Sequence, residues 1–355
     1  MITPHSSPPK LALLGLAIGE SLSWSSMYEH SNELPLWLSR IRREMEADLR
    51  DEKISSFPKP FSLNQSPEPL KPAPGDFTEW AAWTSKLLIE FKADFNHNHL
   101  DKAWQKLAES RKQIGGRISV QAALRNIEVG MTAPQSGRFN PHYFDDAALS
   151  RAVMIGSVFS GDLPLAKRLT ELDASFTQFE DGIWSAVSIA SLFCQAAKAA
   201  SIDDLIEQAI TGIPKGSLTE ITVTTALKES EAMRGGILET ALFLNTNVCN
   251  QIYSYGNIAH EILACVLVIL KMSQGNYDKM LACAAMVPSP GPGLLSLCVS
   301  LAAVLNPQQF QTITSYKSDY FKLRGGSLPE LKDLDLRQLA AQLDSPTIFK
   351  TQTKD

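Results

Sequence analysis

This sequence has no run of positive charge. No stretch of its 355 residues is rich in Lys and Arg, and the net charge is -5. The densest basic cluster, Arg40 to Arg43, is followed directly by acidic residues, which is typical of a solvated helix face. Because nucleic acids are bound by clustered positive charge, this composition argues against a nucleic-acid partner.

Long apolar runs are also missing. The strongest ones, Leu11 to Ile18 and Ile262 to Leu270, are too short to cross a bilayer, so we expect no membrane span. No basic segment precedes the first run, which argues against a signal peptide. The five cysteines form no CxxC motif. We therefore expect buried free thiols and a cytoplasmic protein, and no local pattern supports the alternative of a nucleophilic cysteine.

The sequence shows no convincing alternation of apolar and polar residues, and no repeat at a solenoid period. A hydrophobic content of 44% and a charged content of 20% are typical of a globular chain. The prediction is an all-α fold, a single globular domain of many helices. We expect a flexible N-terminus at 1–10, a helical domain at 11–306 with a Pro-rich loop at 57–75, and a C-terminal helical extension and tail at 307–355.

One stretch combines a turn-rich loop with a strongly apolar helix. Ser289 to Gly293 has the sequence S-P-G-P-G, which cannot be a helix interior. Leu294 to Leu305 is apolar nearly all round, so it predicts a buried helix. The N-terminus of such a helix offers unpaired N–H groups to a ligand. The loop has no Asp, Glu, His or Cys, and it therefore supplies no side chain suited to a divalent metal.

Six separated segments occur in an order that resembles the motifs of the ADP-ribosylglycohydrolase family. They are Gly15 to Leu22 (GLAIGESL), Asp76 to Ala81 (DFTEWA), Pro141 to Val153, Thr177 to Gly182 (TQFEDG), Ile252 to Glu261, and the loop at Ser289 to Gly293. The resemblance covers residues 11 to 306. It implies an all-α fold that holds two magnesium ions and removes ADP-ribose from modified side chains or related molecules.

The first metal-binding segment of that family is T-D-D-T, and this chain matches it only in part. Gly75 stands at the first threonine, Asp76 matches the first aspartate and Thr78 matches the last threonine. Phe77 replaces the second aspartate, where it adds apolar bulk in place of a charged oxygen. Hard divalent cations need several carboxylate and hydroxyl oxygens, so this segment has lost part of its ligand set.

The other family motifs also differ. The second metal-binding segment is D-T-D, and here its acidic positions fall among Pro290 and Pro292, with Gly293 at the threonine. Glu20 replaces the aspartate of the opening segment, and Gln178 replaces a histidine. One carboxylate and one hydroxyl cannot hold two magnesium ions, and desolvating an ion without ligands is costly. We therefore expect no cofactor, and magnesium only if a rearranged site is active.

The candidate catalytic residues are four carboxylates, Asp76, Asp145, Asp146 and Glu20. Asp76 and Thr78 are the remaining candidates for a metal. The candidate ligand-binding residues lie in the matched segments, and they are Asp76, Thr78, Tyr143, Phe144, Asp146, Arg151, Tyr255 and Gly256.

Each of these candidates has a structural alternative. Asp76 is either a helix N-cap or a ligand residue. Asp145 and Asp146 are either an acid–base pair or residues that cap a helix. Arg151 either holds a phosphate or pairs with Asp146. The nearby aromatic residues either frame an adenine or ribose pocket or belong to the core, and they are Trp80, Trp83, Tyr143, Phe144, Tyr253 and Tyr255.

The sequence has no P-loop, no G-x-S-x-G and no HExxH, and His97, His99 and His142 have no metal-ligand spacing. The leading hypothesis is a catalytically inactive relative of the family that binds ADP-ribose, a nucleotide-like ligand or a protein partner. The alternative is an active hydrolase of ADP-ribosyl or related glycosidic bonds with a rearranged site. The sequence identifies neither the ligand or partner nor the oligomeric state.

Overall fold

The structure is a computed structural model that describes residues 6–33, 47, 50–53, 72–234, 236–252, 257–312 and 318–344. The basic cluster at 40–43 and most of the Pro-rich loop, residues 57–71, lie outside these residues. The described part of the chain is all-α, as predicted, and its only β-type pairings are the isolated bridges Asp145–Ile258 and Lys322–Asp335. None of the described helices is both long and apolar enough to cross a membrane.

The α-helices vary from one turn to 26 residues. They are α1 (Pro8–Glu33), α3 (Asp76–Phe91), α4 (His97–Glu109), α5 (Ile118–Glu128), α6 (Gln135–Arg138), α7 (Leu149–Val158), α8 (Leu163–Ala174), α9 (Asp181–Gln195), α10 (Ile202–Ile210), α11 (Leu218–Ser230), α12 (Ile237–Phe243), α13 (Ala259–Ser273), α14 (Tyr277–Ala285), α15 (Pro292–Leu305), α16 (Pro307–Thr312) and α17 (Leu336–Leu343).

Short 3-10 turns and one π-helix connect some of these helices. They are η2 (Lys92–Asp94), η3 (Arg111–Gln113), η4 (Asp146–Ala148), the π-helix η5 (Leu244–Val248), η6 (Ser318–Phe321) and η7 (Pro329–Leu331). In the predicted C-terminal extension, η7 is followed by α17, with Lys332 to Asp335 between them.

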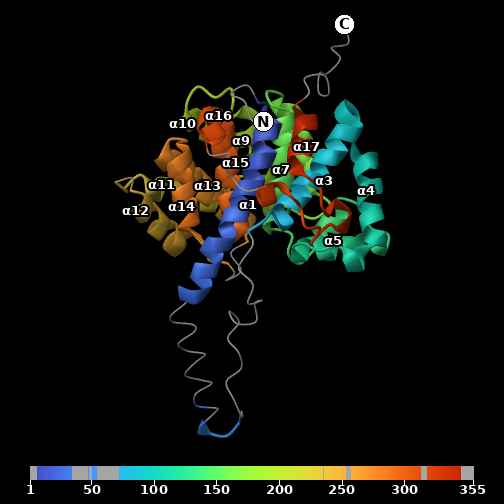
Figure 1. The fold of residues 1–355 in the computed structure, drawn as a ribbon, viewed down its shortest axis with the longest axis horizontal. Helices are drawn as coiled ribbons and strands as arrows, with labels where there is room; N and C mark the ends of the chain where they lie inside the picture. The colour runs from blue at the N-terminus through green and yellow to red at the C-terminus, as the bar shows by residue number, and fades with distance from the viewer. Residues whose placement is uncertain are drawn as a thin grey trace.

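Helix α1 crosses the middle of the molecule (Figure 1). Helices α3, α4 and α5 lie on one side of it, and α11, α12 and α14 lie on the other side. Helices α7, α13 and α15 are buried along almost their whole length, which explains why their sequences are apolar nearly all round. The predicted buried helix at Leu294 to Leu305 is therefore confirmed, and the apolar run Ile262 to Leu270 lies in a second buried helix, α13.

The packing of α1 on α15 depends on two glycines. A Cβ atom added at Gly15 would lie 2.5 Å from Ser300 Cα, and one added at Gly19 would lie 2.6 Å from Ser296 Cα. The hydroxyl of Ser300 donates to the carbonyl of Ala12 at 2.8 Å, which ties the two backbones together. The small residues of α1 predict a close neighbour, and that neighbour is the helix after the S-P-G-P-G loop.

Tryptophans fill the interface between α3 and α4. Trp80 stacks on Trp104 with ring centroids 5.4 Å apart, and Trp83 meets both rings edge-on. Trp80 and Trp83 are only 2% and 4% exposed. Of the two alternatives for these residues, membership of the core is therefore correct.

Both chain ends of the described region are attached to the domain. Helix α1 begins at Pro8, so the last three residues of the predicted flexible N-terminus are helical. The ammonium group of Lys10 pairs with Asp344 at 2.7 Å. At the other end, the carboxylate of Glu79 accepts the backbone N–H groups of Gly326, Ser327 and Leu328. We call residues 326–328 the C-terminal strap.

Replacing Gly15 with Ala should destabilise the fold, because the new methyl group would overlap the backbone of α15. We expect a loss of about 1–3 kcal/mol in the free energy of unfolding, measured by urea denaturation. Gly236→Ala is the matched control, because its φ is -80° and the nearest atom to a new Cβ is 4.0 Å away. A Gly15→Ala protein as stable as the control would contradict this packing.

His260 should make stability depend on pH. Burial lowers the pKa of His260 to about 4, although the Asp181 carboxylate opposes this shift. The unfolded state has a pKa near 6.5, so it takes up a proton first as the pH falls. The contribution of His260 to the free energy of unfolding should be fully present above about pH 7. It should fall by roughly 3 kcal/mol between pH 6.5 and 4. Urea denaturation of the parent and of His260→Gln at each pH in this range measures this dependence. If the free energies of unfolding of the two proteins changed equally with pH, the prediction would be contradicted.

Candidate functional site

A guanidinium group lies between two carboxylates at the N-terminal end of α3. Arg117 Nε donates to Asp146 Oδ1 at 2.5 Å, and its Nη2 donates to Asp146 Oδ2 at 3.0 Å. The third nitrogen, Nη1, donates to Asp76 Oδ2 at 3.1 Å. Asp146 is completely buried, whereas the side chains of Arg117 and Asp76 are 19% and 22% exposed. The structure therefore joins two of the predicted site residues through an arginine that was not predicted.

The loop before α5 has two glycines that allow Arg117 to reach this position. Gly116 has a φ of +136°, which a residue with a side chain rarely adopts. A Cβ atom at Gly115 would lie 2.8 Å from Ser327 Cα, and the Gly115 N–H donates to the Ser327 carbonyl at 2.7 Å. The glycines let the loop pass directly beneath the C-terminal strap.

Asp76 is not the N-cap of α3, contrary to one prediction. Gly75 is the N-cap and makes no side-chain cap, and Asp76 is the first helical residue. The carboxylate of Asp76 accepts instead from Arg117 and from Ser327 Oγ, the latter at 2.7 Å. It therefore belongs to the cluster formed by Asp76, Arg117 and Asp146, which we call the charged site.

Glu20 supplies the cap that Asp76 does not. Its carboxylate accepts the backbone N–H groups of Phe77 at 3.0 Å and Thr78 at 2.9 Å. Burial raises the pKa of Glu20, and the hydrogen bonds from Thr78 and Gly75 oppose this rise. A catalytic role was one hypothesis for Glu20, but the structure commits both oxygens to the start of α3.

Asp145 and Asp146 have different roles. Asp145 accepts from Ser119 Oγ at 2.6 Å, from the N–H groups of Ser119 and Ala147 at 3.1 Å, and from Gln178 Nε2 at 2.9 Å. It therefore caps η4, as one alternative predicted. Burial and the charge of Asp146 raise the pKa of Asp145. Asp146 pairs with Arg117, so the two aspartates do not form a free acid–base pair.

Arg151 is part of the core, and its ion-pair partner is Asp173 in place of the predicted Asp146. Its guanidinium is fully buried and donates to Asp173 Oδ2 at 2.7 Å, to Thr177 Oγ1 at 2.9 Å and to the Ala147 carbonyl at 3.0 Å. It also lies over the ring of Trp104, 5.2 Å from the centroid. Each nitrogen of this fully buried group donates to a protein oxygen.

Thr78, Tyr143 and Phe144 are the remaining predicted ligand residues that the structure describes. Thr78 is fully buried in α3. Tyr143 and Phe144 are half-buried and pack edge-to-face, with centroids 5.0 Å apart. The Phe144 carbonyl accepts the Ala259 N–H at 3.0 Å, which attaches this loop to α13. Tyr253, Tyr255 and Gly256 lie outside the described residues.

The start of α15 reaches the same place. A Cβ atom at Gly293 would lie 2.8 Å from Asp146 Oδ2 and 3.4 Å from Phe77 Cε2. Phe77 is only 2% exposed, so its ring fills the space between the two helix starts. Gly291, with a φ of +67°, makes the turn that lets α15 begin at Pro292. The segments that resemble the two metal-binding motifs thus meet in space.

A comparison with protein families finds one match that covers most of the chain. The model of the family described as ADP-ribosylglycohydrolase matches residues 10–287. The chain belongs to this family. A search of curated proteins finds no match. Helix α15 and the C-terminal strap follow the matched region, although both contact the charged site of this ADP-ribosylglycohydrolase family member.

The residues of this family member do not fit two magnesium ions. Magnesium needs an octahedron of oxygen ligands, with carboxylates free to bind it. Asp76 and Asp146 are both engaged by the Arg117 guanidinium. Phe77 offers hydrocarbon, and Gly293 offers no side chain. Within the described ranges, no three His, Cys, Asp or Glu side chains are grouped so that they could hold a metal ion.

Replacing Arg117 with Ala should leave a buried, unpaired carboxylate at Asp146. We expect a loss of about 3 kcal/mol in the free energy of unfolding, because breaking a buried pair exposes the desolvation cost of the remaining charge. Arg111→Ala is the matched control, because Arg111 pairs with the half-exposed Glu128 at 2.9 Å. The control should lose at most about 1 kcal/mol. Equal losses in urea denaturation would contradict the assignment.

Proposed function

We propose that this ADP-ribosylglycohydrolase family member does not use the dinuclear magnesium chemistry of its family and acts as a binding protein. The observation that carries the proposal is the guanidinium of Arg117 between Asp76 and Asp146. A cation already neutralises Asp76, the carboxylate that matches the family's first metal-binding segment, together with its neighbour Asp146. A magnesium ion would have to displace it and leave a partly buried arginine without its partners.

The charge balance of the site supports this proposal. Burial lowers the pKa of Arg117, but the carboxylates of Asp146, Asp76 and Asp145 outweigh burial, and the net shift is upward. Arg117 therefore stays charged at every pH at which the protein is folded. Its deprotonation does not free the two carboxylates for a divalent cation.

ADP-ribose or a nucleotide-like molecule is the ligand class that we propose for the site. Asp76 and Arg117 keep about a fifth of their side-chain surface open to solvent. The half-buried rings of Tyr143 and Phe144 are candidate surfaces for a base or a ribose. A protein partner in a regulatory or assembly complex is the second form of the binding role. The cytoplasmic location remains part of the proposal, and the five described cysteines are all buried free thiols.

Calorimetric titration with ADP-ribose, with and without magnesium, tests this proposal. We expect a single binding event whose Kd changes by no more than about twofold when magnesium is added. Asp76→Ala should weaken binding, because it removes one partner of Arg117 and one exposed oxygen of the site. Arg111→Ala should bind as the parent does, because its ion pair lies on the surface.

Two results would overturn parts of the proposal. Magnesium-dependent binding, with turnover of an ADP-ribosylated substrate that Asp76→Ala abolishes, would establish the alternative of an active hydrolase with a rearranged site. No ADP-ribose binding under any condition would remove the nucleotide ligand and leave the protein partner.

A further inference from the structure

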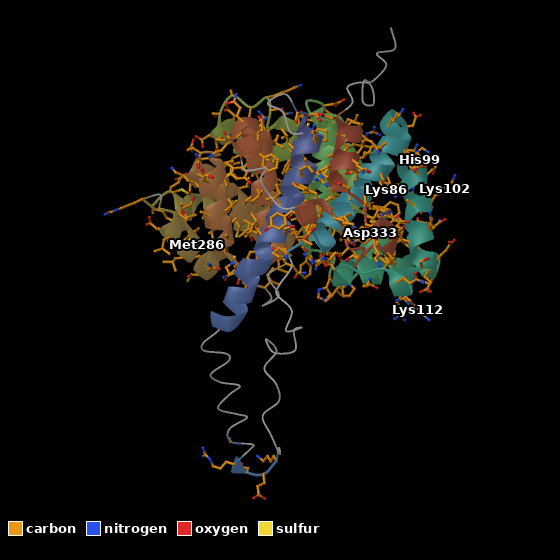
Figure 2. All side chains as sticks on the ribbon, in the orientation of Figure 1. Lys86, His99, Lys102, Lys112, Met286 and Asp333 are labelled. Carbon is orange, nitrogen blue, oxygen red and sulfur yellow. The ribbon has the colours of Figure 1, made fainter. Side chains whose placement is uncertain are left out.

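A second candidate site lies on the other half of α3. A groove of about 470 Å³ separates the C-terminal half of this helix from α4. It begins at Trp83, seven residues after Asp76, which is about 10 Å along the helix axis. Figure 2 shows three of its side chains, Lys86, His99 and Lys102, on the same side of the molecule. The groove shares no lining residue with the charged site.

The floor of the groove is apolar and rigid. Trp83, Leu87 and Leu107 line it, and each of them is at least nine-tenths buried. At one end the ring of Phe91 stacks on His99, with centroids 3.9 Å apart and planes 7° from parallel. His99 Nδ1 is hydrogen-bonded to the Asp94 carbonyl at 2.9 Å, which holds the stacked pair in place. The groove therefore has a preformed shape.

Three lysines stand around this floor. Lys86 projects from α3, and Lys102 and Lys106 project from α4. Within the described residues, none of the three ammonium groups pairs with a carboxylate. Glu90, one turn after Lys86, and Glu330 also line the groove, yet neither forms an ion pair with a lysine there. The three lysines outnumber the two carboxylates that line the groove, so its lining carries a net positive charge in a chain whose net charge is -5.

We propose that this groove binds a small anion that carries a carboxylate, sulfonate or phosphate on an apolar body. Its volume lies within the range of small-molecule sites, about 300–1,000 Å³. The apolar body would lie on Trp83 and Leu87, and the anionic group would take the lysines as partners. The walls run for only about 12 Å along each helix, and the Phe91–His99 pair occupies one end. These dimensions favour a small molecule over a partner helix.

The probe for this site is 8-anilinonaphthalene-1-sulfonate, an anion on an aromatic body whose fluorescence rises when it is bound. Its neutral counterpart is N-phenyl-1-naphthylamine. We expect the full chain to bind the anionic probe with a stoichiometry of one, more tightly than the neutral probe and less tightly as salt is added. Because Trp83 lines the groove, binding should also quench tryptophan fluorescence.

Charge reversal separates this groove from other surfaces. Lys86→Glu/Lys102→Glu should raise the Kd of the anionic probe about tenfold, because two favourable contacts become repulsive. Lys112→Glu/Lys215→Glu changes the net charge equally at two exposed lysines away from the groove and should bind as the parent does. Lys102→Gln, which removes charge without adding repulsion, should raise the Kd about twofold and tests the proposal if the double variant fails to fold.

Equal binding by the two double variants would overturn the proposal, as would equal affinity for the neutral probe. Absence of any binding by the parent chain would overturn it too. If a short acidic helical peptide displaced the probe at lower concentration than any small aromatic carboxylate, the occupant would be a protein segment and the proposal would again be wrong. The state of Arg117 affects none of these readouts, so the result is independent of the proposed function.

Discussion

The arrangement of the charged site depends on a single guanidinium group. Asp76 begins α3, Asp146 begins η4, and Arg117 precedes α5, so three elements that are distant in sequence meet at one cation. Two carboxylates so close to one another in a mostly buried place would repel each other without a positive charge between them. Arg117 supplies that charge from the chain itself. Phe77 and Gly293 lie beside carboxylates whose charge is already balanced by Arg117.

The carboxylates around the charged site are also held in place by hydrogen bonds. Asp145, next to the charged aspartate, is fixed by Ser119 and Gln178, and Glu20 is fixed by two N–H groups of α3. These carboxylates cannot turn toward a ligand without leaving buried donors unsatisfied. A mobile general acid or base has no counterpart among them. What remains available to a ligand is the exposed part of Asp76 and Arg117, which is the part that the proposed binding role uses.

The apolar core was predictable from the sequence, and the charged site was predictable only in part. The buried helices α13 and α15 are marked by continuous apolar runs, and the small residues of α1 predict its close packing. Asp76, Phe77 and Gly293 could be brought together through the family motifs. Arg117 could not, because it lies in no matched motif and its role depends on where a glycine loop directs it. Arg151 was misjudged for a similar reason, since its partner Asp173 is on a helix that sequence spacing does not relate to it.

The C-terminal strap has a consequence for the order in which the protein is made. The Ser327 hydroxyl donates to Asp76, and its carbonyl accepts the N–H of Gly115, just before Arg117. The Glu79 carboxylate accepts three N–H groups of the strap. During synthesis the chain emerges from its N-terminus, and α1, α3 and α5 are available long before residue 327. The ribosome therefore exposes the carboxylates and the arginine first, and their last hydrogen-bond partner becomes available only after residue 327 has been made. A nascent chain stalled before the strap would have the whole family-matched region and yet an unfinished site.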